Sequence, residues 1–296
     1  MNNIKKIYFA PNWGMTTEQM AGDYIKQTPN VSGKWKNIEV TSNLTESDYL
    51  VIQDHCDEDL LNKFPKEKRL YFSREAMDDQ SIKKYYGRVM MYSYWNDTGF
   101  LWTKWHYMNM SCGIHKTYDE LVVEDSNPYD KNKLLSCIQS DKQFTEGHKL
   151  RHNFLANFIK TTPELIDLYG GISFRNKILK DDDKFYALSN YKYCLSFDNQ
   201  DTIKSFFGTQ FTDSILYWTV PIYWGGANLD RFFPKDSYIQ IDIRKSGELD
   251  RVIDIINNDD YESRLPALKE ARELILNKYN MWPMLDEIIN TGGLNF

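Results

Sequence analysis

The sequence predicts an α/β fold built as two halves of similar size. Short apolar runs with the period of strands alternate along the chain with amphipathic stretches of helical period, an order typical of parallel sheets covered by helices. A polar stretch over residues 124–133 separates two such series. The 296 residues suffice for two domains of about 120–150 residues. We expect domains over 1–130 and 131–280, with a carboxy-terminal helix and tail over 281–296 packing back on the first.

The first half opens with a strand over 5–10. This strand ends at Pro11, Asn12, Trp13 and Gly14, which together form a turn signal. Pro65 stops a later helix because proline cannot continue the helical hydrogen bonding. The other elements expected in this half are helices over 17–27 and 57–64 and strands over 34–40, 49–53 and 69–73.

The second half begins with a predicted strand over 134–139 and a predicted helix over 145–160. In that helix Leu150, Phe154 and Phe158 fall at helical spacing and therefore share one buried face. We also expect a short helix over 162–168, because Pro163 suits a first helical turn. The elements expected after residue 226 are a strand over 238–243 and helices over 248–256, 261–279 and 284–289.

Residues 191–226 form the stretch around which the second half is organised. An alternating strand over 191–197 leads into a polar loop from Asp198, and a helix with one apolar face then precedes a strand over 219–224. Strand, loop, helix and strand make a βαβ unit, and parallel sheets of such units bind ligands beyond the carboxyl ends of their strands. By pattern alone an ordinary βαβ unit with nothing bound fits equally well.

Composition excludes several classes of protein. The apolar fraction of 42% and the aromatic fraction of 15% support a packed core and argue against long disorder. The net charge of −6 provides no general basic surface for nucleic acid. No stretch approaches the roughly 20 apolar residues of a membrane span, and the amino terminus lacks a signal-peptide core. We therefore expect a soluble, cytoplasmic protein, in a bacterium or, for a viral protein, in the host cytoplasm.

Neither the cysteines nor the histidines predict a metal site. The four cysteines are far apart without a CxxC pair, so free thiols are expected at Cys56, Cys112, Cys137 and Cys194. The five histidines include no HExxH spacing. The run of Asp181, Asp182 and Asp183 superficially fits a metal-binding D-x-D, but it lies between Lys180 and Lys184 and is typical of a solvated loop. We assign no metal.

The stretch over residues 92–115 is unusually aromatic. It carries Trp95, Phe100, Trp102, Trp105 and Tyr107 among polar residues. Packing in a core is the ordinary role of such a cluster. A surface on which an acceptor sugar stacks is the functional alternative.

The central stretch resembles the alpha-1,3-fucosyltransferase family. That family carries an F-E-N-S sequence, a Y-V-T-E-K helix start and a V-P-I-Y-W-G strand. The corresponding segments here are residues 197–200, 206–210 and 220–225, and the last is the most specific. Upstream, residues 170–176 look like the family's glycine-rich G-G-S-V-R-N segment, which contains Arg175. The convincing resemblance covers about residues 134–245.

The amino-terminal half is more weakly similar. Asn12, Trp13 and Gly14 resemble a W-G turn after the first strand. Residues 68–75 resemble the strand whose end carries a glutamate proposed as catalytic base, which falls on Glu75. The family's diphosphate-binding arginine falls on Arg151.

The resemblance implies a GT-B architecture, with two Rossmann-like domains facing each other across a cleft. The carboxy-terminal domain would hold a nucleotide-sugar, the amino-terminal domain mostly the acceptor, and sugar transfer would invert the anomeric carbon without metal or cofactor. One departure stands out, because Thr209 and Gln210 replace the family's Glu-Lys pair that contacts the donor. Asp198 for the family's glutamate is a milder change. The donor is therefore GDP-fucose or another nucleotide-sugar, such as a UDP-sugar.

Each site residue has an assigned role and an ordinary alternative. Glu75 would deprotonate the acceptor hydroxyl, and its alternative is a surface ion pair with Arg74. Arg151 and Arg175 would bind the diphosphate, because a guanidinium can contact phosphate in bidentate fashion. The expected donor pocket comprises Arg151, Arg175, Asp198, Asn199, Phe206, Gly208, Thr209 and Gln210. The expected acceptor side comprises Asn12, Trp13, Trp95 and Trp102.

Three functions follow from these assignments. The first is an inverting glycosyltransferase that acts on a saccharide hydroxyl. The second is a phage or viral enzyme that glycosylates a hydroxylated DNA base, for which Lys34, Lys36, Lys104 and Lys116 would have to supply the positive charge. The third is a non-catalytic nucleotide- or sugar-binding module, which would account for the missing Glu-Lys pair.

Overall fold

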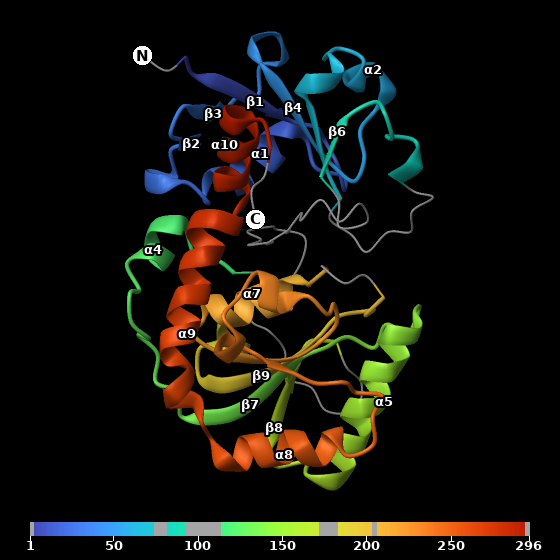
Figure 1. Ribbon diagram of the computed structural model, residues 1–296, viewed down its shortest axis with the longest axis vertical. Coiled ribbons are helices and arrows are strands. Elements are labelled where there is room, and N and C mark those ends of the chain that lie inside the picture. Colours follow the sequence, from blue (N-terminus) through green and yellow to red (C-terminus); the bar gives the residue numbers. More distant parts are fainter. Residues whose placement is uncertain (1–2, 74–81, 93–113, 172–182, 203–205, 294–296) are drawn as a thin grey trace. The chain divides into compact units, whose positions relative to one another are not determined.

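The computed structural model describes residues 3–73, 82–92, 114–171, 183–202 and 206–293. In this part the chain forms two compact α/β units (Figure 1). The first unit contains the residues up to 92, Lys116–Val122 and those from Lys278 onward. The second contains the residues between, from Val123 to Asn277, together with 114–115.

The first unit is a six-stranded sheet with strand order β2-β3-β1-β4-β5-β6. The β2–β3 pair is antiparallel and all other neighbours are parallel. The strands are β1 (Lys5–Phe9), β2 (Lys34–Trp35), β3 (Ile38–Val40), β4 (Tyr49–Gln53), β5 (Arg69–Phe72) and β6 (Met90–Tyr92). The helices are α1 (Thr17–Ile25), α2 (Glu58–Leu61), α4 (Tyr118–Val122) and α10 (Met281–Thr291). All five residues of β4 are buried, as a central strand covered on both faces requires.

The carboxy-terminal helix α10 belongs to this first unit. The indole of Trp282 is fully buried and its Nε1–H donates to the carbonyl of Tyr24 in α1 (2.9 Å). Figure 1 shows α10 in red beside α1 and the β2–β3 hairpin. A predicted single strand over 34–40 is wrong, because Lys36 adopts a left-handed backbone (φ 51°) and turns the chain back on itself.

The second unit is a parallel five-stranded sheet with order β11-β10-β9-β7-β8. Its strands are β7 (Lys133–Ile138), β8 (Ile166–Tyr169), β9 (Tyr191–Phe197), β10 (Val220–Trp224) and β11 (Ile239–Gln240). Its helices are α5 (Glu146–Thr161), α6 (Phe185–Leu188), α7 (Thr209–Leu216), α8 (Glu248–Asn258) and α9 (Tyr261–Leu274), the last followed by a π-helical turn, Ile275–Tyr279. The predicted helix over 162–168 is therefore wrong. Ile166 and Leu168 are buried and alternate with half-buried Asp167, the period of a strand, so the short segment pairs with β7.

The strand order of the second sheet reverses between β7 and β9. From β7 the chain passes through α5 to β8 on one side, and then returns to β9 on the other side of β7. Figure 1 shows β7 and β9 together in the middle of this unit. Ligands of open parallel sheets bind at such a reversal, beyond the carboxyl ends of the strands.

The segment predicted as a linker over 124–133 is anchored in the second unit. Glu124 accepts a hydrogen bond from the Arg272 guanidinium (3.1 Å), and both side chains are buried. The Lys131 ammonium, also buried, donates to the carbonyls of Leu188 (3.0 Å) and Tyr217 (2.7 Å). Two charged side chains of the segment, Glu124 and Lys131, are therefore held inside the second unit by hydrogen bonds.

Arg272→Met tests this anchoring. The change leaves the Glu124 carboxylate in a buried place without its cation, and breaking a buried pair in this way costs about 3–5 kcal/mol. We expect a large fall in the thermal unfolding temperature. Arg251→Met is the matched control, because Arg251 is half-exposed in its pair with Glu248 and such pairs contribute about 0–1 kcal/mol. Equal shifts for the two variants would contradict the anchoring.

Candidate functional site

The Asp198 carboxylate joins three segments at the carboxyl edge of the second sheet. Asp198 follows β9 directly and is 7% exposed. Its oxygens accept from the Gly208 N–H (3.0 and 3.2 Å), which precedes α7, and from the Tyr223 hydroxyl in β10 (2.5 Å). The Tyr223 hydroxyl in turn accepts from the Gly226 N–H (2.9 Å). Burial, together with the negative charge of Asp198, raises the pKa of Tyr223 well above its usual value.

Two glycines allow the carboxylate to sit this close to the backbone. A Cβ at Gly208 would lie 2.3 Å from Asp198 Oδ1, closer than any non-bonded carbon can approach. A Cβ at Gly225 would lie 2.5 Å from Asp198 Oδ2 and 2.1 Å from the Tyr223 hydroxyl. Glycine is therefore required at both positions, because any side chain would displace the carboxylate.

The start of α5 is hydrogen-bonded to the loop that follows Asp198. Thr145, the N-cap residue, donates its hydroxyl to the Asn199 carbonyl (2.9 Å) and accepts from the His148 N–H (3.2 Å). The Thr145 N–H donates to His148 Nδ1 (3.3 Å), completing a capping box. A Cβ at Gly147 would lie 2.1 Å from the Asn199 carbonyl oxygen, so helix and loop touch backbone to backbone.

Arg151 lies one turn further along α5 and keeps most of its hydrogen-bonding capacity. Its Nη1 donates to the carbonyl of Phe197 at the end of β9 (3.2 Å). Its Nε–H is buried and has no partner among the described residues. Burial lowers the pKa of Arg151, with the charge of Asp198 opposing that shift, and the group stays cationic at neutral pH. A guanidinium has five N–H donors, so this one has several for a ligand.

The helix α7 begins where the family's charged pair was expected. The Gln210 amide donates to the Leu195 carbonyl of β9 (2.9 Å), and so holds α7 on the sheet. Thr209 Oγ1 lies 3.4 Å from the Lys184 ammonium. The Phe206 carbonyl lies 3.2 Å from the Tyr223 hydroxyl, whose single hydrogen is directed mainly to Asp198 at the shorter distance. Asn199 Oδ1 is buried without a partner among the described residues.

Seven of the eight predicted donor-pocket residues lie among the described residues, all in the second unit. They are Arg151, Asp198, Asn199, Phe206, Gly208, Thr209 and Gln210. Arg175 lies outside the described residues, as do Glu75, Trp95 and Trp102. Direct contact of each residue with a donor stays a prediction.

In the first unit, Asn12 and Trp13 form the turn after β1. The Asn12 amide donates to the Gln53 carbonyl at the end of β4 (2.5 Å), and its Oδ1 accepts from the Trp13 N–H (2.8 Å). Trp13 adopts a left-handed backbone (φ 52°). The turn lies at the carboxyl edge of the first sheet, the edge at which an acceptor was predicted.

Sequence reasoning missed the residues whose role depends on tertiary contacts. Tyr223 was noticed only as part of a motif, and Lys184 only as the end of an aspartate run. The spacing of Thr145 and His148 is that of a capping box, but histidine in place of the usual Glu or Gln hides it.

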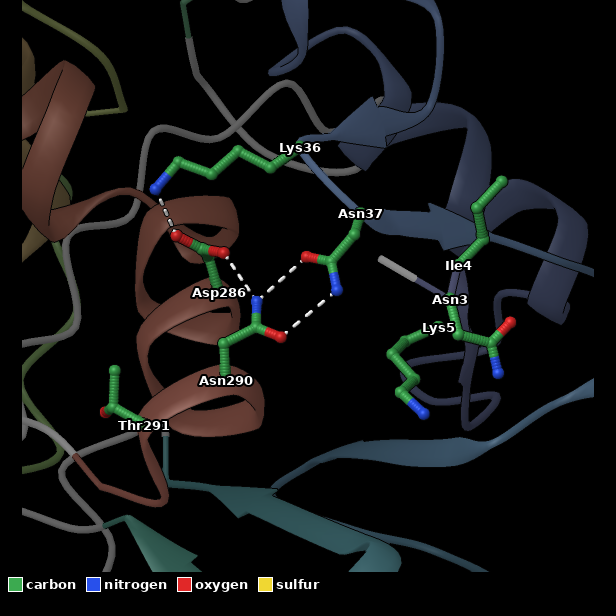
Figure 2. Close-up of a pocket in the computed structure, with 8 residues that line it drawn as sticks. All are labelled: Asn3, Ile4, Lys5, Lys36, Asn37, Asp286, Asn290 and Thr291. Carbon is green, nitrogen blue, oxygen red and sulfur yellow. Dashed lines mark hydrogen bonds and ion pairs between the residues drawn. The ribbon is translucent and has the colours of Figure 1, made fainter. Parts of the chain in front are cut away.

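A polar pocket of about 900 Å³ was not predicted either. It lies in the first unit at the amino end of β1, where Lys36 and Asn37 face Asp286 and Asn290 of α10 (Figure 2). This edge is opposite to the Asn12 turn. In the described ranges, no three His, Cys, Asp or Glu side chains gather as they would around a metal ion. None of the described helices is long and apolar enough to cross a membrane.

Comparison with known proteins agrees with the fold. Residues 129–264 match the model of glycosyltransferase family 10 (fucosyltransferase), carboxy-terminal part. That range contains the whole arrangement around Asp198. No curated protein sequence matches the chain significantly.

Solved structures resemble the chain over nearly its full length. A glycosyltransferase from Rickettsia africae ESF-5 is 11% identical, with a TM-score of 0.55 and 98% of both chains covered. An alpha1,3-fucosyltransferase is 15% identical, with a TM-score of 0.51, and the match covers 94% of this chain and 91% of that one. A structure of alpha1,3-fucosyltransferase with GDP-fucose is 17% identical, with a TM-score of 0.48. The predicted fold class is confirmed: an α/β protein of the GT-B type with two Rossmann-like units.

Tyr223→Phe tests the arrangement around Asp198. The change leaves the Gly226 N–H without its acceptor and the buried carboxylate without its hydroxyl donor. We expect a loss of about 2 kcal/mol in unfolding free energy, because unpaired buried groups cost about 1–3 kcal/mol. Tyr186→Phe, at a tyrosine that is 41% exposed, is the control and should be neutral. If both variants melt at the wild-type temperature in calorimetry, the network does not stabilise the site.

His148→Gln tests the cap of α5. Burial and the positive charges of Arg151 and Lys142 lower the pKa of His148 below its ordinary value of about 6.5. The fold therefore favours neutral histidine, and this stabilisation is present above about pH 6.5 and is lost as the pH falls through the folded pKa. Glutamine can accept from the Thr145 N–H without titrating. We expect the melting temperature of the wild type to fall more steeply than that of the variant between pH 7 and 5, and parallel curves would contradict the assignment.

Proposed function

Because residues 129–264 match the model of glycosyltransferase family 10 and the fold resembles that of an alpha1,3-fucosyltransferase, we propose that this chain transfers a sugar from a nucleotide-sugar to a saccharide hydroxyl. The transfer inverts the anomeric carbon and needs no metal. GDP-fucose is the first candidate donor. The proposal is supported most directly by Arg151, a half-buried arginine at the carboxyl edge of a parallel sheet. Its Nε–H has no partner in the part of the chain that the structure describes.

The leaving group explains why such an arginine matters. A departing nucleoside diphosphate gains negative charge as the bond to the sugar breaks, and fixed cations at its oxygens stabilise that charge. Arg151 is held by the Phe197 carbonyl, so it needs little reorganisation to meet a ligand. In the proposal Arg175 supplies a second cation.

The first turn of α7 adds neutral donors. The first N–H groups of a helix have no partner within the helix, and the helix dipole favours an anion there. In α7 these groups belong to Thr209 and Gln210, beside the loop that begins at Asp198. The Gly208 N–H already donates to Asp198, so it is not available to the ligand. The carboxylate instead fixes the position of the backbone at the start of α7.

The other half of the reaction is assigned to the first unit. Glu75 takes the proton of the acceptor hydroxyl, and Asn12, Trp13, Trp95 and Trp102 form the acceptor side. A saccharide suits this surface better than DNA. Two of the four lysines that a DNA groove would need are paired with carboxylates, Lys34 with Glu39 (3.3 Å) and Lys36 with Asp286 (2.5 Å).

A transfer assay with a panel of donors tests the function. We expect transfer of fucose from GDP-fucose to a saccharide acceptor, with an inverted anomeric carbon by NMR and with undiminished rate in EDTA. Transfer from a UDP-sugar instead would change the donor. Salt-sensitive transfer to hydroxymethylated duplex DNA would change the acceptor. Tight nucleotide binding without turnover on any donor would contradict an enzymatic role.

Arg151→Ala tests the assignment of the diphosphate site. Removing one preorganised group that stabilises charge lowers turnover by about 10²-fold, and we expect a loss of that order in kcat/KM. Arg151→Lys should recover little, because an ammonium lacks the forked geometry. Lys149→Ala removes an exposed charge from the same helix and is the control. Wild-type kcat/KM in folded Arg151→Ala would show that the diphosphate binds elsewhere.

A further inference from the structure

A buried ion pair contacts α7 near its first turn. The Lys184 ammonium donates to Asp213 Oδ2 at 2.6 Å, and the two side chains are 6% and 0% exposed. Lys184 precedes α6, whereas Asp213 lies in α7, so the pair ties one helix to the other. The Asp213 carboxylate compensates the charge of this buried ammonium.

The same ammonium reaches the side chain of Thr209. Lys184 Nζ lies 3.4 Å from Thr209 Oγ1, a long hydrogen bond. An ammonium can only donate, so Thr209 Oγ1 must accept this hydrogen bond. The hydroxyl hydrogen of Thr209 therefore points away from Lys184. That hydrogen has no acceptor among the described residues. Thr209 is half-exposed and is therefore accessible to a ligand.

We propose that Lys184 is a positioning residue that makes Thr209 a hydrogen-bond donor to a phosphate oxygen of the nucleotide-sugar. Asp213 holds the ammonium in place, and the ammonium both orients and polarises the hydroxyl. This inference rests on the proposed function. It explains how a neutral residue serves at a donor site where the resemblance predicts a charged pair.

The buried pair would also stabilise the fold if it had no such role, so a single variant is not decisive. Lys184→Met leaves Asp213 buried without its cation and destabilises the protein. The double variant Lys184→Met with Asp213→Leu removes both charges, and such replacements are often neutral for stability. The double variant therefore shows whether donor binding needs the Lys184 ammonium in a protein whose stability is unchanged.

The experiment compares the double variant with Thr209→Val and Thr209→Ser. We expect all three to melt near the wild-type temperature. Thr209→Val and the double variant should each raise the KM for the donor about tenfold, while kcat changes less, and Thr209→Ser should stay close to wild type. Combining Thr209→Val with the double variant should add little further loss, because both changes remove the same contact. The inference would be overturned if either the double variant or Thr209→Val had the wild-type KM for the donor.

Calorimetry with GDP and guanosine separates this inference from the function on which it rests. The advantage of GDP over guanosine should shrink in Thr209→Val and in the double variant. Wild-type protein that binds no nucleotide and transfers no sugar would overturn both proposals. Wild-type binding that both variants leave unchanged would overturn this inference alone.

Discussion

The carboxylate of Asp198 is the group on which the rest of the site depends. It ends β9, accepts from the backbone that starts α7, and accepts from Tyr223 in β10. Burying a carboxylate is costly unless hydrogen bonds satisfy it. Gly208 and Gly225 let those bonds form at short range. Asp198, which was predicted to belong to the donor pocket, is enclosed by these hydrogen bonds, and its contact with a donor stays a prediction.

The groups left over by this network are those a diphosphate would need. Thr145 and Gly147 hold α5 on the loop after β9. This places Arg151 at the same edge, with an Nε–H that has no partner among the described residues. The first turn of α7 adds backbone donors. The described part of this site comes from the second sheet alone. In our proposal the acceptor is bound by residues of the first unit.

How far the sequence predicted the fold depended on how much of the signal was local. The strand over 191–197 was predicted with the correct bounds, because a long alternating run before a polar loop fits a strand and does not fit a helix. Four-residue β8 was predicted as a helix, since a short run after Pro163 carries little periodicity and pairing with β7 decided its structure. The loop after Asp198 was assigned to donor binding through its motif alone. Lys184 and Tyr223 could not be found, because their partners are distant in sequence and meet only in the folded sheet.

We propose that the donor binds at the strand-order reversal of the second sheet, between β7 and β9. Hydrogen–deuterium exchange with and without GDP tests it most directly, because backbone protection reports where a ligand orders the chain. We predict protection in peptides that cover the start of α5, the loop after Asp198 and the first turn of α7. Protection confined to other segments, such as those lining the pocket between β1 and α10, would show that GDP binds elsewhere.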